Sequence, residues 1–160
     1  EAIAAMQKSL ALINTNLGMA AEAAAAMKTG VPPSGVLEKV ARIVQEIPDL
    51  VVNGEASGKL LVVGWGSTYG AIVGAVSALR AEGRSVSSIH LRHLNPFPSN
   101  LGAIMSRFEK VLIPEMNLGQ LLMMIRARYL VDAIGYNKVQ GKPFKEAEIR
   151  TRIMDLLESN

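Results

Sequence analysis

The stretch Lys59–Gly70 constrains the fold of this chain more than any other part of its sequence. It opens with the apolar run Leu60-Leu61-Val62-Val63 and ends in Gly64-Trp65-Gly66-Ser67-Thr68-Tyr69-Gly70. A short apolar run without alternation is typical of a strand that is buried on both faces of a parallel sheet. Small residues at helical spacing follow it. The pattern therefore predicts a strand that turns into a helix at the carboxyl edge of a sheet.

The residues after this turn continue the alternation of strands and helices. Strands are predicted at 60–63, 85–91, 110–114, 129–133 and 136–139, and helices at 67–82, from Ser99 or Asn100 (as the cap) to about 108, at 118–128 and at 145–157. Such alternation is the signature of right-handed βαβ crossovers. We therefore predict a three-layer α/β fold with a mainly parallel five-stranded sheet and helices on both faces.

The first third of the chain differs from the rest. Residues 1–28 are rich in alanine, and apolar residues recur every three or four positions from Ile3 to Leu17, which predicts an amphipathic helix. Leu50-Val51-Val52 could form a short edge strand. We divide the chain into a helical segment at 1–30, a helix (about 35–46) and linker at 31–58, and the α/β domain at 59–160.

Composition excludes several classes of protein. With 160 residues, of which 49% are hydrophobic and 19% charged, the chain is long enough for one domain with a real core. It has no cysteine, which excludes disulfides and thiolate metal sites and fits a cytoplasmic protein. The net charge of +3 is spread without basic runs, so nucleic-acid binding is not indicated, and no apolar stretch is long enough to span a membrane. Because the chain opens on Glu1, we expect a mature or truncated piece of a longer protein.

The glycine-rich turn lies where a dinucleotide-binding fingerprint would lie. Its spacing, Gly64-x-Gly66-x-x-x-Gly70, is one residue longer than the usual motif, and the next strand ends in His90-Leu91-Arg92 without an acid for a ribose hydroxyl. The pattern argues against a dinucleotide. Ser67 and Thr68 could help a helix amino end to bind an anion, or could simply cap that helix.

Polar residues also follow the next predicted strand. Arg92 and His93 lie at its carboxyl end, where sites of open α/β sheets occur, and Asn95 stands in the proline-rich loop behind them. Alternatively, they hydrogen-bond loop carbonyls or a neighbouring domain. Residues three apart in a strand point to opposite faces, so His90 and His93 are not expected to share a metal unless the strand ends between them.

A third polar turn follows the strand at 110–114. Glu115 could act as a general acid or base, could cap the following helix, or could pair with Arg92. Asn117 stands at the start of that helix. We expect no catalytic, cofactor-binding or metal-binding residue in this chain, and a polar interface edge formed by Ser67, Thr68, Arg92, His93, Asn95, Glu115 and Asn117.

Four segments, at 64–70, 90–98, 111–120 and 127–132, occur in an order that resembles one family. They carry GWGSTYG, HLRHLNPFP, VLIPEMNLGQ and ARYLVD. Together they closely resemble the carboxyl-terminal part of the alpha subunit of 2-oxoacid:ferredoxin oxidoreductases, most closely the 2-oxoglutarate branch. The match covers roughly Val36 to Arg152, whereas residues 1–30 match nothing in that family.

The resemblance implies a domain similar to the carboxyl-terminal domain of transketolase. The enzyme would oxidatively decarboxylate 2-oxoglutarate to succinyl-CoA and reduce ferredoxin. Thiamine diphosphate, magnesium and a 4Fe–4S cluster are expected elsewhere in the complex, because this chain lacks the family motifs that hold them. The expected partners are the thiamine-binding domain of the same subunit and the beta subunit, with ferredoxin as an indirect partner.

The resemblance thus implies a non-catalytic assembly domain in a cytoplasmic heteromer. Two alternatives stay open at the level of sequence. One is a free-standing nucleotide- or anion-binding module that uses the turn at 64–70. The other is a regulatory interaction domain that docks through residues 1–28.

Overall fold

The computed structural model describes residues 35, 42, 43 and 45–159. The chain separates into two compact units, residues 1–46 and 47–160. In the first unit, the described residues are helical. The predicted helical segment at 1–30 and most of the predicted helix at 35–46 lie outside the described residues. The second unit carries the α/β fold.

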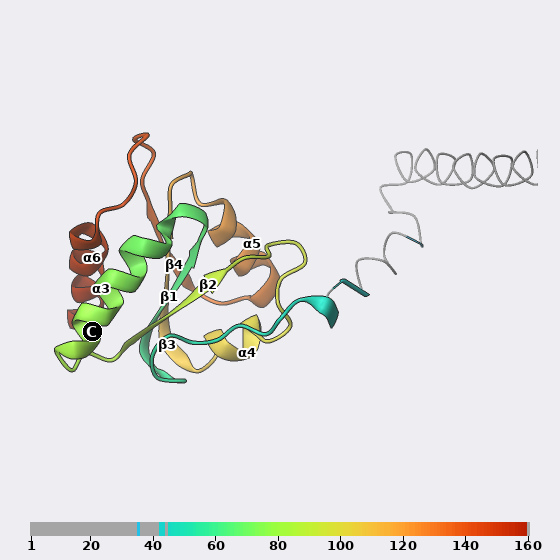
Figure 1. The fold of residues 1–160 in the computed structure, drawn as a ribbon, viewed down its shortest axis with the longest axis horizontal. Helices are drawn as coiled ribbons and strands as arrows, with labels where there is room; N and C mark the ends of the chain where they lie inside the picture. The colour runs from blue at the N-terminus through green and yellow to red at the C-terminus, as the bar shows by residue number, and fades with distance from the viewer. Residues whose placement is uncertain (1–34, 36–41, 44, 160) are drawn as a thin grey trace, which may run out of the picture. The chain divides into compact units, whose positions relative to one another are not determined.

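This second unit alternates strands and helices (Figure 1). The elements are β1 (Gly58–Trp65), a 3₁₀ turn η1 (Gly66–Thr68), α3 (Tyr69–Ala81), β2 (Val86–Leu91), α4 (Leu101–Met105), β3 (Phe108–Glu115), α5 (Gln120–Tyr129), β4 (Ala133–Asn137) and α6 (Glu146–Glu158). The strands are all parallel and lie in the order β2-β1-β3-β4. The chain runs outward from β1 to β2 and then crosses back over β1 to β3, so the strand order reverses between β1 and β3.

Two apolar clusters, one on each face of the sheet, confirm the three-layer α/β class. Alternate residues of β1 enter opposite clusters: Leu60 and Val62 pack with α3 and α6, whereas Leu61 and Val63 pack with α4 and α5. Figure 1 shows the same pairing of helices on the two sides of the sheet. All four side chains are fully buried, as an apolar run without alternation predicts.

The prediction of five strands is wrong, since the described residues form a sheet of four. The two strands expected at 129–133 and 136–139 are a single strand, β4. α5 continues to Tyr129 and ends at Leu130, whose φ of +53° turns the chain. Gly135 lies inside β4, where a Cβ would come within 2.8 Å of Leu122 Cδ2. This glycine therefore makes room for α5 and does not mark a turn.

Residues 48–53 run beside the free edge of β2 but do not form the edge strand expected at Leu50–Val52. The only pairing of this segment with β2 in the described structure is an isolated antiparallel bridge between Asn53 and Ser88. One such bridge is too short for a ladder, so the segment covers the edge as an extended loop.

Side-chain hydrogen bonds from the loop after β2 hold this segment in place. Asn100 Nδ2 donates to the Leu50 carbonyl, and the Leu50 N–H donates to Asn100 Oδ1, each at 3.0 Å. Ser99 Oγ donates to Asp49 Oδ1 at 3.0 Å. The expectation that Ser99 or Asn100 caps α4 is therefore wrong: Asn100 occupies the N-cap position, but its side chain bonds to Leu50 instead.

Candidate functional site

The turns after β1 and β3 meet at the point where the strand order reverses. In open α/β sheets, ligands usually bind in the crevice at this point. Here Ser67 Oγ lies 3.4 Å from Met116 Sδ, so the two turns are in contact. Each turn leads into a helix, α3 or α5, and free N–H groups at a helix amino end are common anion donors. The hydrogen bonds of the two turns therefore decide what this crevice can bind.

In the turn after β1, Thr68 closes the backbone on itself. Its hydroxyl donates to the Trp65 carbonyl at 2.8 Å and accepts from the Trp65 N–H at 3.2 Å, and its side chain is buried. Gly66 has a φ of +57°, a conformation that favours glycine. Thr68 thus shapes the turn and does not cap α3 through its side chain. Ser67 is exposed beside it.

Gly64 sets how closely α3 approaches β1. A Cβ at this position would lie 2.5 Å from Ile72 Cδ1 and 3.1 Å from Thr68 Oγ1, both of which belong to buried residues. Only a glycine leaves space for the Ile72 side chain here. Of the three glycines in the 64–70 turn, only Gly64 serves this contact between helix and sheet, since nothing lies within 4 Å of a Cβ at Gly66 or Gly70.

In the turn after β3, Glu115 and Asn117 together satisfy the amino end of α5. Gly119, with a φ of +93°, is the N-cap residue and offers no side chain for capping. The fully buried Glu115 carboxylate accepts two helix N–H groups, and the Asn117 side chain accepts two more. The bonds are Leu121 N to Glu115 Oε1 (2.8 Å), Leu122 N to Glu115 Oε2 (3.0 Å), Gly119 N to Asn117 Oδ1 (2.8 Å) and Gln120 N to Asn117 Oδ1 (3.1 Å). The first four N–H groups of α5 are therefore occupied by the protein itself.

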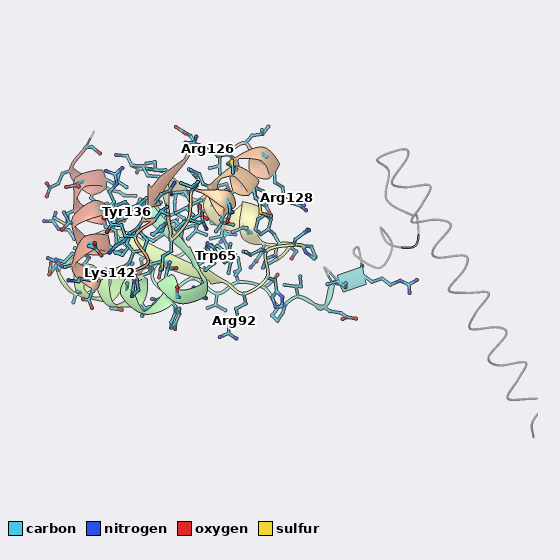
Figure 2. All side chains as sticks on the ribbon, turned by 90° about the horizontal axis from the view of Figure 1, so that it is seen from above. Trp65, Arg92, Arg126, Arg128, Tyr136 and Lys142 are labelled. Atoms are coloured by element: carbon cyan, nitrogen blue, oxygen red, sulfur yellow. The ribbon has the colours of Figure 1, made fainter. Side chains whose placement is uncertain are left out.

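The side chains of the predicted polar edge thus do not form one connected cluster. Glu115 and Asn117 act together at α5, and in residues 45–159 no ion pair or hydrogen bond joins Glu115 to Arg92. Arg92, His93 and Asn95 are exposed after β2, with Asn95 preceding a cis peptide bond to Pro96. Figure 2 shows Arg92 reaching outward from the body of the domain.

A cavity of about 470 Å³ lies beside the free edge of β2, and we call it the β2 cavity. Arg92 and His93 line it together with His90 and Tyr69. β2 ends at Leu91, between the two histidines, so both reach the same cavity. The rest of the wall is mainly apolar and includes Pro48, Leu50, Val51, Ile72, Val73 and Pro98.

His90 is held as a neutral ring in this wall. Its Nδ1 is buried against Gly64 without a hydrogen-bond partner, and its ring meets the edge of Tyr69 with centroids 4.9 Å apart. Burial lowers the pKa of His90 below its ordinary value of 6.5, and the positive charge of Arg92 lowers this pKa further. The imidazole is therefore uncharged at neutral pH.

This lowered pKa predicts that acid destabilises the fold. Below about pH 6.5 the unfolded chain protonates His90, whereas the folded chain does so only at a lower pH, so stability falls in that window and is unaffected above it. We expect His90→Gln to weaken the loss of stability between pH 7.5 and 5.5, measured by urea unfolding. His93→Gln, at the exposed histidine of the same cavity, is the matched control and should retain the loss. An equal loss in wild type and His90→Gln would contradict the prediction.

Tyr69 and Asp49 lie beside Arg92 and His93 in the β2 cavity, although neither was expected there from the sequence. Asp49 and Tyr69 reach the β2 cavity from segments far from β2 in sequence, so no local motif could connect them. The position of His90 at this site could have been predicted from the sequence, because a histidine in a strand that ends one residue later lies at the carboxyl edge.

Two further features are absent from the described part of the chain. No helix there has the length and apolar character to cross a membrane. No group of three or more histidine, cysteine, aspartate or glutamate side chains there could hold a metal ion.

Residues 58–149 match the family model for pyruvate:ferredoxin oxidoreductase core domain II, which covers more than half of the chain. The chain belongs to this family. Among curated relatives, it is 47% identical to the 2-oxoglutarate oxidoreductase subunit KorA of Mycobacterium tuberculosis over 104 residues, which is 64% of this chain and 16% of that protein. It is 32% identical to the alpha subunit of 2-oxoacid:ferredoxin oxidoreductase 2 of Aeropyrum pernix, over 76% of this chain and 20% of the relative.

A solved structure of a related enzyme has a similar fold. The 2-oxoglutarate:ferredoxin oxidoreductase of Magnetococcus marinus aligns with a TM-score of 0.69 and 30% sequence identity, over 72% of this chain and 21% of that one. This domain II chain therefore spans only about a fifth or less of the length of the proteins it matches. The resemblance drawn from the four sequence motifs is confirmed.

Proposed function

We propose that this domain II chain is the non-catalytic assembly part of the alpha subunit of a 2-oxoglutarate:ferredoxin oxidoreductase. The 47% identity to a 2-oxoglutarate oxidoreductase subunit supports the substrate branch. The observation that carries the assembly role is the use of Thr68, Glu115 and Asn117 within the fold, at the crevice where a ligand would otherwise bind. Residues that hold their own turns in place are not free to do chemistry.

The whole enzyme would oxidatively decarboxylate 2-oxoglutarate to succinyl-CoA and pass electrons to ferredoxin. The Magnetococcus marinus structure is described with 2-oxoglutarate, coenzyme A and succinyl-CoA bound, which supports this reaction for the longer protein. Thiamine diphosphate, magnesium and a 4Fe–4S cluster would lie on other parts of the complex. The partners of this chain would be the thiamine-binding domain of the same subunit and the beta subunit, in the cytoplasm.

Exposed apolar side chains indicate the surface that such a partner would cover. Tyr69, Leu118 and Val139 follow β1, β3 and β4 at the carboxyl edge, and they are 56%, 81% and 62% exposed. Large apolar side chains that gather at one edge of a domain mark interaction sites more often than isolated ones do. We therefore place the assembly surface on these apolar residues, in addition to the polar residues expected there.

The test uses the full-length alpha subunit that contains this domain, produced together with its beta subunit. Leu118→Asp and Val139→Asp should reduce the amount of assembled complex at least about tenfold, because a buried interfacial charge costs more than 1.4 kcal/mol. Each substitution should leave the stability of the 160-residue chain within about 0.5 kcal/mol, since both side chains are exposed. Lys59→Asp, which puts the same acid on an exposed residue at the opposite edge of the sheet, is the control.

Two readouts separate the parts of the proposal. Assembly is measured by size-exclusion chromatography, and activity by reduction of ferredoxin with 2-oxoglutarate or pyruvate in the presence of coenzyme A. Wild-type assembly of both aspartate variants would reject the apolar edge as the interface. Activity with pyruvate but not with 2-oxoglutarate would reject the substrate branch.

A further inference from the structure

The β2 cavity lies apart from the crevice between β1 and β3, and it shares Tyr69, Arg92 and His93 with the proposed assembly surface. Its volume of about 470 Å³ falls within the range of small-molecule pockets, which is roughly 300–1,000 Å³. Its walls come from the segment at 48–53, from β2 with its following loop, and from the start of α3. The segment at 48–53 is fixed to β2 and its following loop by the Asn100 and Ser99 hydrogen bonds and by the bridge from Asn53.

Arg92 gives this cavity a cationic guanidinium group, and within residues 45–159 no salt bridge occupies its N–H donors. The salt bridges in this range involve Arg80, Arg126, Lys138 and Arg150. A guanidinium group presents paired N–H donors that match the two oxygens of a carboxylate. The carboxylate of Asp49, which also lines the cavity, accepts the Ser99 hydroxyl.

The histidines and Tyr69 add donors beside Arg92. Because Nδ1 of the neutral His90 ring is buried without an acceptor, we assign the proton to Nε2, which leaves Nε2 as a donor at the wall. Contact with the Tyr69 ring fixes the orientation of His90. His93 and the Tyr69 hydroxyl supply further donors.

The remaining wall is mainly apolar, with Asn53 and Ser88 as further polar residues, and it selects against a ligand with a second negative charge. Leu50, Ile72, Val73 and Pro98 offer surface to a hydrocarbon or ring, and Asp49 would repel a second anionic group. From these groups we propose that the β2 cavity binds a small organic monocarboxylate with an apolar body. The carboxylate pairs with Arg92 beside the two histidines, and the apolar body packs on Ile72 and Val73.

Calorimetric titration of the 160-residue chain tests this assignment with three probes. 3-Phenylpropanoate should bind saturably, whereas 3-phenylpropanamide, which has the same body without the charge, and 2-oxoglutarate, which has a second carboxylate, should each bind at least about tenfold more weakly. Arg92→Gln should lower the affinity for 3-phenylpropanoate by the same factor. Arg84→Gln, at another exposed arginine, should leave this affinity unchanged.

Each other outcome overturns the proposal. Absence of saturable binding would show that the cavity holds no such ligand. Equal affinity for the acid and the amide, or wild-type affinity in Arg92→Gln, would remove Arg92 from the site. Equal affinity for 2-oxoglutarate would remove the requirement for an apolar body. These measurements use neither the beta subunit nor enzyme activity, so they stand or fall independently of the assembly role.

Discussion

Glu115→Ala is expected to lower the free energy of unfolding by about 3 kcal/mol, the largest effect of any polar substitution considered for this chain. The carboxylate is fully buried and accepts the N–H groups of Leu121 and Leu122. Its removal leaves two helix donors without acceptors in the protein interior, and each such group costs about 1–3 kcal/mol. Urea unfolding followed by circular dichroism measures the loss.

Three further variants show whether capping is the cause. Glu115→Gln retains one acceptor but turns an NH₂ group toward the other donor, so we expect about half the loss seen with alanine. Asn117→Ala should cost about 1 kcal/mol, the usual value for a lost cap. Glu109→Ala, at an exposed position of the same strand, should change stability by less than about 0.5 kcal/mol. If Glu115→Ala behaved like Glu109→Ala, the carboxylate would not be holding α5, and a role in chemistry would have to be reconsidered.

Gly64→Ala is expected to lower the free energy of unfolding by about 1–3 kcal/mol, because one added methyl overpacks the contact between α3 and β1. The new Cβ would lie 2.5 Å from Ile72 Cδ1, and Ile72 is only 2% exposed, so its side chain would have to shift to accept the methyl. Ile72→Val removes the overlapping methyl. In the double variant the cost of the two changes should be at least about 1 kcal/mol less than the sum of the single costs.

Gly70→Ala is the matched control, taken from the same glycine-rich stretch. Nothing lies within 4 Å of a Cβ at Gly70, which is in the first turn of α3. Alanine there should be neutral or stabilise the chain by up to about 1 kcal/mol, since alanine is the better helix former. Gly64→Ala with the same effect as Gly70→Ala would contradict close packing at Gly64.

The order of strands and helices could be predicted because it rests on local patterns. The run Leu60–Val63 lacks alternation because each of its residues is buried on one of two apolar faces, and this is visible without a structure. The last strand was not predictable in this way. Glycine is typical of turns, so the sequence predicts one at Gly135. Only the approach of Leu122 shows why a glycine is required inside β4.

For the polar residues too, the sequence predicted the position, whereas only the structure showed the role. Glu115 could be placed at the end of a strand from sequence, where a cap or an ion-pair partner of Arg92 was favoured over a general acid or base, but the sequence did not distinguish the cap from the ion pair. The fold selects the cap, because the strand delivers the carboxylate to the free N–H groups of α5. Likewise, Asn100 was expected to cap the helix that it precedes. Its side chain instead forms hydrogen bonds with the backbone of Leu50, 50 residues earlier in the chain.

The sequence by itself therefore determined the α/β class, the buried β1 strand, the helix-forming segments and the family, since each depends on neighbours within a few residues or on motifs in order. The tertiary structure decided the number of strands, the roles of Glu115 and Asn100, the need for glycine at positions 64 and 135, and the existence of the β2 cavity. Each of these depends on contacts between segments far apart in the chain. Local periodicity carries no information about such contacts, because they arise only when the layers pack.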